Sequence, residues 1–162
     1  MRLLKRIVML GLASCLVPPP AAGQTAPRRL ALLVGTNRYL AHIDGLDRVA
    51  YAEADVSGLK AVLDAQGFET VVVTGDAVRR EVIVAELTRL AREVREQDEV
   101  VFFLAGTTVR GGAGTRPRIY WLGYTSTLAG LDADAMRLDQ LLDDFREIRA
   151  RRKLALLDVY HA

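Results

Sequence analysis

The chain has 162 residues, of which 51% are hydrophobic and 26% charged, a balance typical of one globular domain and not of a disordered or fibrous chain. Its formal net charge is +2, but the first 23 residues contain three cations and no acid, so the rest of the chain is close to neutral. Aromatic residues make up only 6%. Composition and charge together argue against a basic, base-stacking surface, and we expect no nucleic-acid partner.

Residues 1–23 have the three-part layout of a secretory signal peptide. Met1–Arg6 is basic, Ile7–Val17 is uncharged and apolar, and small residues follow before an expected cleavage at Gln24. As a helix the apolar run would be about 16 Å long, too short for the roughly 30 Å core of a bilayer, so we expect no membrane span. The sequence predicts an exported bacterial protein, periplasmic or extracellular. The alternative is a lipoprotein signal that anchors the chain through Cys15, the only cysteine.

After a short linker at 24–29, the body at 30–162 alternates apolar runs with helical patterns. Runs of apolar residues predict strands at 30–34, 70–73, 100–105, 119–122 and 154–157. Apolar residues three and four positions apart predict helices over 50–66, Ile83–Val94 and Leu138–Ile148, and Asp76 is expected to cap the second of these. Strands that are apolar throughout and joined by helices predict an α/β fold, with a mostly parallel sheet flanked by helices on both faces.

In such a sheet, ligands bind at the carboxyl edge of the strands. The segments after the first, third and last predicted strands should meet there. They contain these candidate site residues: Asn37, His42, Gly106, Thr107, Thr108, Asp158, Tyr160 and His161. A hydroxyl beside an imidazole can supply the nucleophile and the base of a hydrolase site. The candidate residues allow two such pairs, Thr107 with His161 or Tyr160 with His42.

Other motifs have simpler interpretations. The glycine-rich segment 110–116 has no Lys-Ser/Thr pair and leads into a predicted strand, so it is expected to be a loop and not a phosphate cradle. Two histidines and scattered carboxylates provide no metal-ligand spacing, and we expect neither metal nor cofactor. The cations of 149–153 are interpreted as a solvated helix end. Three acids are expected to be surface or capping residues: Asp132, Asp134 and Asp139.

Five stretches, in order, resemble the caspase-like cysteine peptidases of bacteria, the metacaspase and paracaspase relatives. They are Leu30–Tyr39, Leu46–Phe68, Val100–Gly106, Leu131–Leu142 and Lys153–Ala162. The resemblance covers nearly all of the body and implies a caspase–haemoglobinase α/β fold, which agrees with the predicted sheet. It covers only the first part of the family domain.

The resemblance also implies where a catalytic dyad would lie. In that family the third strand ends in Ser/Ala-Gly-His-Gly, whose histidine is the base, and the last strand ends in Asp-x-Cys, whose cysteine is the nucleophile. This sequence has Thr107 at the histidine position and Tyr160 at the cysteine position. Threonine does not titrate near neutral pH, and a phenol with a pKa near ~10 is a poor substitute for a thiol. Both members of the dyad are therefore absent.

These observations lead to three hypotheses. The first is an exported caspase-like domain without peptidase activity, which acts as a binding or regulatory pseudoenzyme. Its partner would be a protein or peptide, including a separately encoded second half of the domain. The second is a hydrolase or peptidase with a site rebuilt from Thr107, His42 or His161. The third is a small-ligand-binding α/β module that uses Gly35–Asn37 and the glycine-rich loop.

Overall fold

The computed structural model describes residues 26–41, 50–111 and 117–161. The expected leader with Cys15, the first two residues of the 24–29 linker, His42 and most of the glycine-rich loop lie outside them. Within these residues, six strands form one sheet: β1 (Arg29–Gly35), β2 (Glu69–Thr74), β3 (Glu99–Gly111), β4 (Arg118–Trp121), β5 (Met136–Arg137) and β6 (Arg152–His161). The helical segments are α1 (Ala52–Ala65), a 3₁₀ turn η2 (Gly75–Ala77), α2 (Arg80–Glu93), α3 (Leu131–Asp134) and α4 (Leu138–Arg146).

The sheet is mixed. Strands β2, β1, β3 and β6 lie side by side in parallel, and β3 extends beyond the end of β1 to pair antiparallel with β4, which in turn pairs with β5. The predicted α/β class is confirmed, but the description "mostly parallel" leaves out the antiparallel part. Strand β4 follows β3 after only a short connection, and a short connection joins antiparallel neighbours whereas parallel strands need a long crossover.

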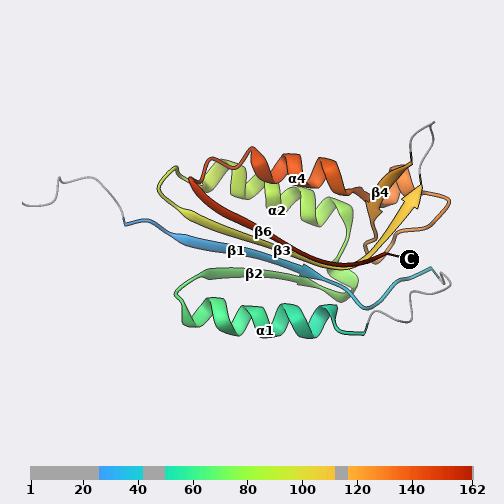
Figure 1. Cartoon of the computed structure of the whole chain (residues 1–162), viewed down its shortest axis with the longest axis horizontal. Helices are drawn as coiled ribbons and strands as arrows, with labels where there is room; N and C mark the ends of the chain where they lie inside the picture. The colour runs from blue at the N-terminus through green and yellow to red at the C-terminus, as the bar shows by residue number, and fades with distance from the viewer. Residues whose placement is uncertain (1–25, 42–49, 112–116, 162) are drawn as a thin grey trace, which may run out of the picture.

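Helices cover both faces of the sheet (Figure 1). Successive side chains of a strand point to opposite faces, so the all-apolar strands supply two cores. On one face Leu33 and Phe103 are buried with Val56 of α1. On the other, Leu32 and Phe102 are buried with side chains of α2 and α4, and the rings of Phe102 and Phe145 lie 5.5 Å apart.

Strand β6 departs from the expectation of burial on both faces. Among the residues that the structure describes, β6 pairs only with β3, and its outer edge is open. The side chains of Leu154 and Leu157 are 52% and 39% exposed. The apolar run Leu154–Leu157 therefore has the composition of an interior strand and the position of an edge strand.

The remaining differences from prediction have local causes. Asp76 does not cap α2, because it lies within η2 and the helix begins only at Arg80. Strands β3 and β6 run to thirteen and ten residues, well past their apolar parts, because each continues to pair with the other. Arg152 and Lys153 belong to β6 and not to a helix end, although the Lys153 ammonium donates to the carbonyl oxygen of Ile148 just after α4 (2.7 Å).

The short elements α3 and β5 were not predicted, since four and two residues carry no periodicity. Within 26–41, 50–111 and 117–161, no helix is long and apolar enough to cross a membrane.

Candidate functional site

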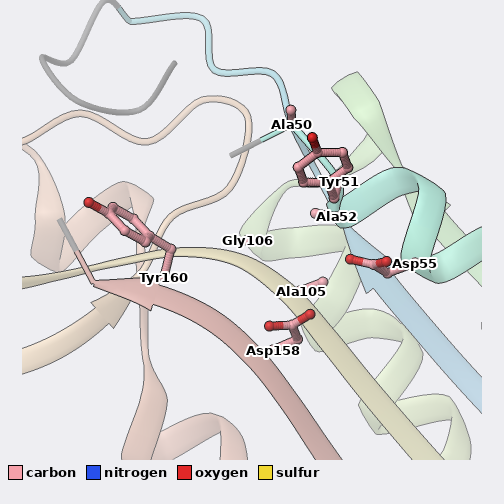
Figure 2. A pocket seen from close by; sticks show the side chains of 8 residues that line it. All are labelled: Ala50, Tyr51, Ala52, Asp55, Ala105, Gly106, Asp158 and Tyr160. Atoms are coloured by element: carbon pink, nitrogen blue, oxygen red, sulfur yellow. The ribbon is translucent and has the colours of Figure 1, made fainter. Parts of the chain in front are cut away.

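A pocket of about 380 Å³ opens at the carboxyl edge of the parallel strands, between the beginning of α1, the middle of β3 and the end of β6 (Figure 2). Its lining comes from three parts of the chain: Ala50, Tyr51, Ala52, Asp55, Ala105, Gly106, Asp158 and Tyr160. Of the candidates named from the sequence, Gly106, Asp158 and Tyr160 line it directly. The edge of the sheet at which a site was expected thus contains a pocket.

Two carboxylates give the pocket its chemical character. Asp55 lies in the first turn of α1 and Asp158 lies on β6, and both side chains border the same hollow (Figure 2). No hydrogen bond or ion pair joins either carboxylate to another side chain in the described part of the chain, and both residues are exposed. Tyr51 and Tyr160 add two aromatic rings that are 72% and 43% exposed. Such a surface suits a cationic group.

Thr107 and Tyr160 occupy the positions implied for the base and the nucleophile, and they are register partners on β3 and β6. Thr107 is fully buried, and its Oγ1 has no hydrogen-bond partner among the described residues. Its backbone N–H donates to the Tyr39 phenol oxygen (3.2 Å), and the phenol donates to the carbonyl oxygen of Thr36 (3.3 Å). Burial raises the pKa of Tyr39, a rise that the bonds with Thr107 oppose. Thr107 is thus part of a buried connection between β3 and the loop after β1.

His161 contacts Thr108 and not Thr107. The Thr108 hydroxyl lies 3.3 Å from His161 Nδ1 and donates to the carbonyl oxygen of Tyr160 (3.1 Å). The cause is the strand period, since neighbouring residues point to opposite faces and the register places Thr108 beside His161. Thr108 is only 2% exposed, so its hydroxyl is shielded from substrate, whereas His161 itself is exposed.

Asn37 does not line the pocket, but its hydrogen bonds fix the position of residues at the pocket's edge. Its side-chain amide donates to the Ala50 carbonyl oxygen (3.0 Å), and its Oδ1 accepts from the Glu53 backbone N–H (3.3 Å). The Asn37 backbone N–H in turn donates to the Glu53 carboxylate (3.2 Å). These bonds satisfy a free N–H at the start of α1 and fix the helix end that carries Tyr51 and Asp55.

Gly106 forms the floor of the pocket in a conformation that requires glycine. Its φ is +142°, and a Cβ there would lie 3.3 Å from Trp121 Nε1 and 3.4 Å from the Tyr39 phenol oxygen. A side chain at this position would both strain the backbone and press on the buried Trp121 and the partly buried Tyr39.

Sequence reasoning did not identify Tyr51 and Asp55 as site residues. The available signal was topological: a helix that follows a parallel strand begins at the carboxyl edge, so its first turn borders any site there. Among the residues that the structure describes, no three His, Cys, Asp or Glu side chains gather closely enough to hold a metal ion.

Comparisons with known proteins agree with the observed architecture. The model of the caspase domain matches residues 28–161, and no curated protein matches the chain. A solved structure with a similar fold is protein GSU0716 from Geobacter sulfurreducens, with a TM-score of 0.66 and 15% identity. The alignment covers 84% of this chain and 51% of that one, so the chain spans about half the length of GSU0716. Because the family match runs from just before β1 to the end of β6, the chain belongs to the caspase-domain family.

Proposed function

We propose that this chain is an exported binding module of the caspase-domain family, without peptidase activity, whose pocket holds a basic side chain of a protein or peptide partner. The observation that carries the proposal is the pair of carboxylates, Asp55 and Asp158, in one pocket with no cation paired to either in the described part of the chain.

The case against catalysis is the lack of an activated nucleophile. The only cysteine in the sequence is Cys15, so the body has no thiol. Thr107 Oγ1 is enclosed, the Thr108 hydroxyl beside His161 is buried, and Tyr160 has no imidazole bonded to its phenol among the described residues. A hydroxyl nucleophile needs a base within hydrogen-bonding reach and an open approach for substrate, and none of these groups has both.

The case for a basic ligand is chemical complementarity. A guanidinium group binds carboxylates through paired charge-assisted hydrogen bonds and also stacks on aromatic rings. The pocket offers Asp55 and Asp158 for the charge and Tyr51 and Tyr160 for the ring faces. Its volume of about 380 Å³ is at the small end of ligand pockets, a size that suits one side chain rather than a whole peptide.

The test is binding of fluorescent peptides that differ at one position, with Arg, Lys, Ala or Asp there, by the full chain. We expect Arg and Lys peptides to bind and Ala and Asp peptides to bind at least about tenfold more weakly, which corresponds to about 1.4 kcal/mol. Binding should weaken with salt, because exposed charges are screened. Asp55→Asn and Asp158→Asn should each reduce the preference for Arg.

The matched control is Glu81→Gln, which removes an exposed carboxylate from the first turn of α2, away from the pocket. It should bind like the native chain. Equal binding of all four peptides would refute the basic-ligand proposal. Cleavage of any peptide by the native chain would refute the non-catalytic part, most clearly if Thr108→Ala or His161→Ala abolished it. A Thr107→His, Tyr160→Cys double variant that is folded and cleaves peptides would show that only the dyad is missing.

A further inference from the structure

The open edge of β6 carries two exposed leucines, Leu154 and Leu157. Ten residues of this strand pair with β3 on one side, and nothing in the described part of the chain pairs with the other. Natural edge strands are usually short, bulged, or interrupted by proline or charge, because a free row of N–H and C=O groups invites another strand. The middle of β6, Leu154–Leu157, has none of these protections.

Along the face of β6 that packs toward α1, the order of the side chains suits pairing of the strand with an antiparallel copy of itself. The register places Leu154 and Leu156 opposite Val101 and Phe103, two residues of the core beneath α1. On that same face Arg152 precedes the two leucines and Asp158 follows them, since alternate residues share a face. The order is therefore cation, leucine, leucine, anion.

We propose that β6 pairs antiparallel with β6 of a second copy of this chain, about a two-fold axis at Ala155. In this register Arg152 lies opposite Asp158 of the second copy and Leu154 lies opposite Leu156, each twice by symmetry. Cross-strand pairs of opposite charge and of apolar side chains are the stabilising units of a sheet. On the other face, Ala155 meets its own copy and Lys153 lies opposite Leu157, so no like charges oppose each other.

Other registers lose this complementarity. With the axis at Leu156, Arg152 would oppose Tyr160 and each Asp158 would oppose Leu154. With the axis at Leu154, Arg152 would oppose Leu156 and Asp158 would lie beyond the start of the neighbouring strand. Of these three registers, only the one with its axis at Ala155 places Arg152 opposite Asp158 and Leu154 opposite Leu156. Arg152 already pairs with Glu99 of its own chain (2.8 Å) but remains 73% exposed, so its guanidinium can bridge both carboxylates.

The inference rests on the edge and not on the proposed function, although Asp158 contributes to both. A basic peptide and the second copy would compete for this carboxylate. Asp55 lies on α1, outside the edge, and belongs to the pocket alone. Asp55→Asn should therefore weaken peptide binding and leave dimerisation unchanged, which separates a failure of one proposal from a failure of the other.

The first experiment is sedimentation equilibrium of the full chain over a wide concentration range. We expect a monomer–dimer equilibrium built on the 17.8 kDa chain. Asp158→Arg should raise the dimer dissociation constant about tenfold or more, because it places arginine opposite arginine twice. Adding Arg152→Asp to that variant should restore dimerisation. Arg92→Asp, the same charge change as Arg152→Asp on an exposed residue of α2, is the matched control and should not restore dimerisation when it is added to Asp158→Arg.

The second experiment tests the register by disulfide cross-linking in a Cys15→Ser background. Directly opposed Cα atoms in antiparallel strands are about 4.5–5.5 Å apart, within reach of a disulfide. Ala155→Cys should therefore cross-link to itself, whereas Leu157→Cys should not, because its copy lies four residues, or about 14 Å, along the strand.

A monomer at every concentration would overturn the proposal, as would a dimer that is indifferent to Asp158→Arg or cross-links at 157 instead of 155. A chain that associates only when a different polypeptide is added would assign the edge to that polypeptide instead.

Discussion

At the scale of single residues, Asp98 shows how one buried carboxylate ties distant parts of the chain together. Its side chain is 1% exposed and accepts hydrogen bonds from the backbone N–H groups of Arg28 and Arg95, both at 2.9 Å. The Arg28 guanidinium also donates a hydrogen bond to the Asp98 carboxylate, with a nitrogen–oxygen distance of 3.2 Å. Burial alone would raise the pKa of Asp98, but the two backbone bonds and Arg28 outweigh it and hold the pKa below its ordinary value.

The lowered pKa makes a prediction about stability against pH. A carboxyl whose pKa is lower in the folded chain than in the unfolded chain, where it is about 3.9, stabilises the fold above that value. The stabilisation is lost as the pH falls through the folded pKa. Asp98→Ala should cost about 3 kcal/mol of unfolding free energy at pH 7, because Arg28 and two N–H groups lose their partner. Urea unfolding at pH 7 and at about pH 3 should show the difference between native and variant shrinking in acid. A difference independent of pH would contradict this assignment.

At the scale of elements, two leucines allow a matched test of which strands and helices are covered. Leu87 of α2 is 3% exposed and belongs to the core between the sheet and helices α2 and α4, whereas Leu154 of β6 is 52% exposed. Leu87→Ala should destabilise the chain by about 3 kcal/mol through lost burial and a cavity, and Leu154→Ala by well under 1 kcal/mol. Denaturant unfolding, at concentrations where the chain is monomeric, measures both. Equal costs would mean that the monomer itself covers β6.

The elements that sequence predicts well are those with a strong apolar pattern. The helix that contains Ile83, Leu87 and Leu90 has all three side chains buried, as its spacing requires. Prediction fails where pairing partners are distant in sequence. Thr107 and Thr108 have the composition of a turn, yet they continue β3 because β6 and β4 provide partners. The sequence of β6 indicates burial on both faces, but no local pattern reveals which neighbours a strand has.

The site was predictable in its place but not in its contacts. Parallel topology alone brings Gly106, Asp158 and Tyr160 to one edge, and in the structure these three residues line the same pocket. The choice between Thr107 and Thr108 as the neighbour of His161 depends on the register of two strands, which a shift of one residue would reverse. Tyr51 and Asp55 enter the pocket through the position of the α1 N-terminus, which is fixed by the bonds of Asn37.

At the scale of the whole molecule, helices cover both faces of the sheet, but no described segment pairs with its β6 edge. Helix α1 covers one face of the sheet and helices α2 and α4 cover the other (Figure 1), whereas Leu154 and Leu157 on the edge strand β6 remain exposed. If a second copy pairs with this edge, folding and association are coupled, because the dimer forms from the native state and not from the unfolded chain. Mass action then stabilises the native state more as the concentration of chains rises.

This coupling predicts that the midpoint of thermal unfolding depends on protein concentration. The native chain should unfold at a higher temperature when it is concentrated, by a few degrees for about 1 kcal/mol of added stability in a domain of this size. Asp158→Arg should unfold at a temperature that changes less with concentration than that of the native chain, and Asp55→Asn, which leaves the edge intact, should behave like the native chain. Differential scanning calorimetry of the three proteins at low and high concentration measures this directly. If the native midpoint stays constant over that range, the exposed leucines of β6 are tolerated by an unpaired monomer, and the open edge does not couple association to folding.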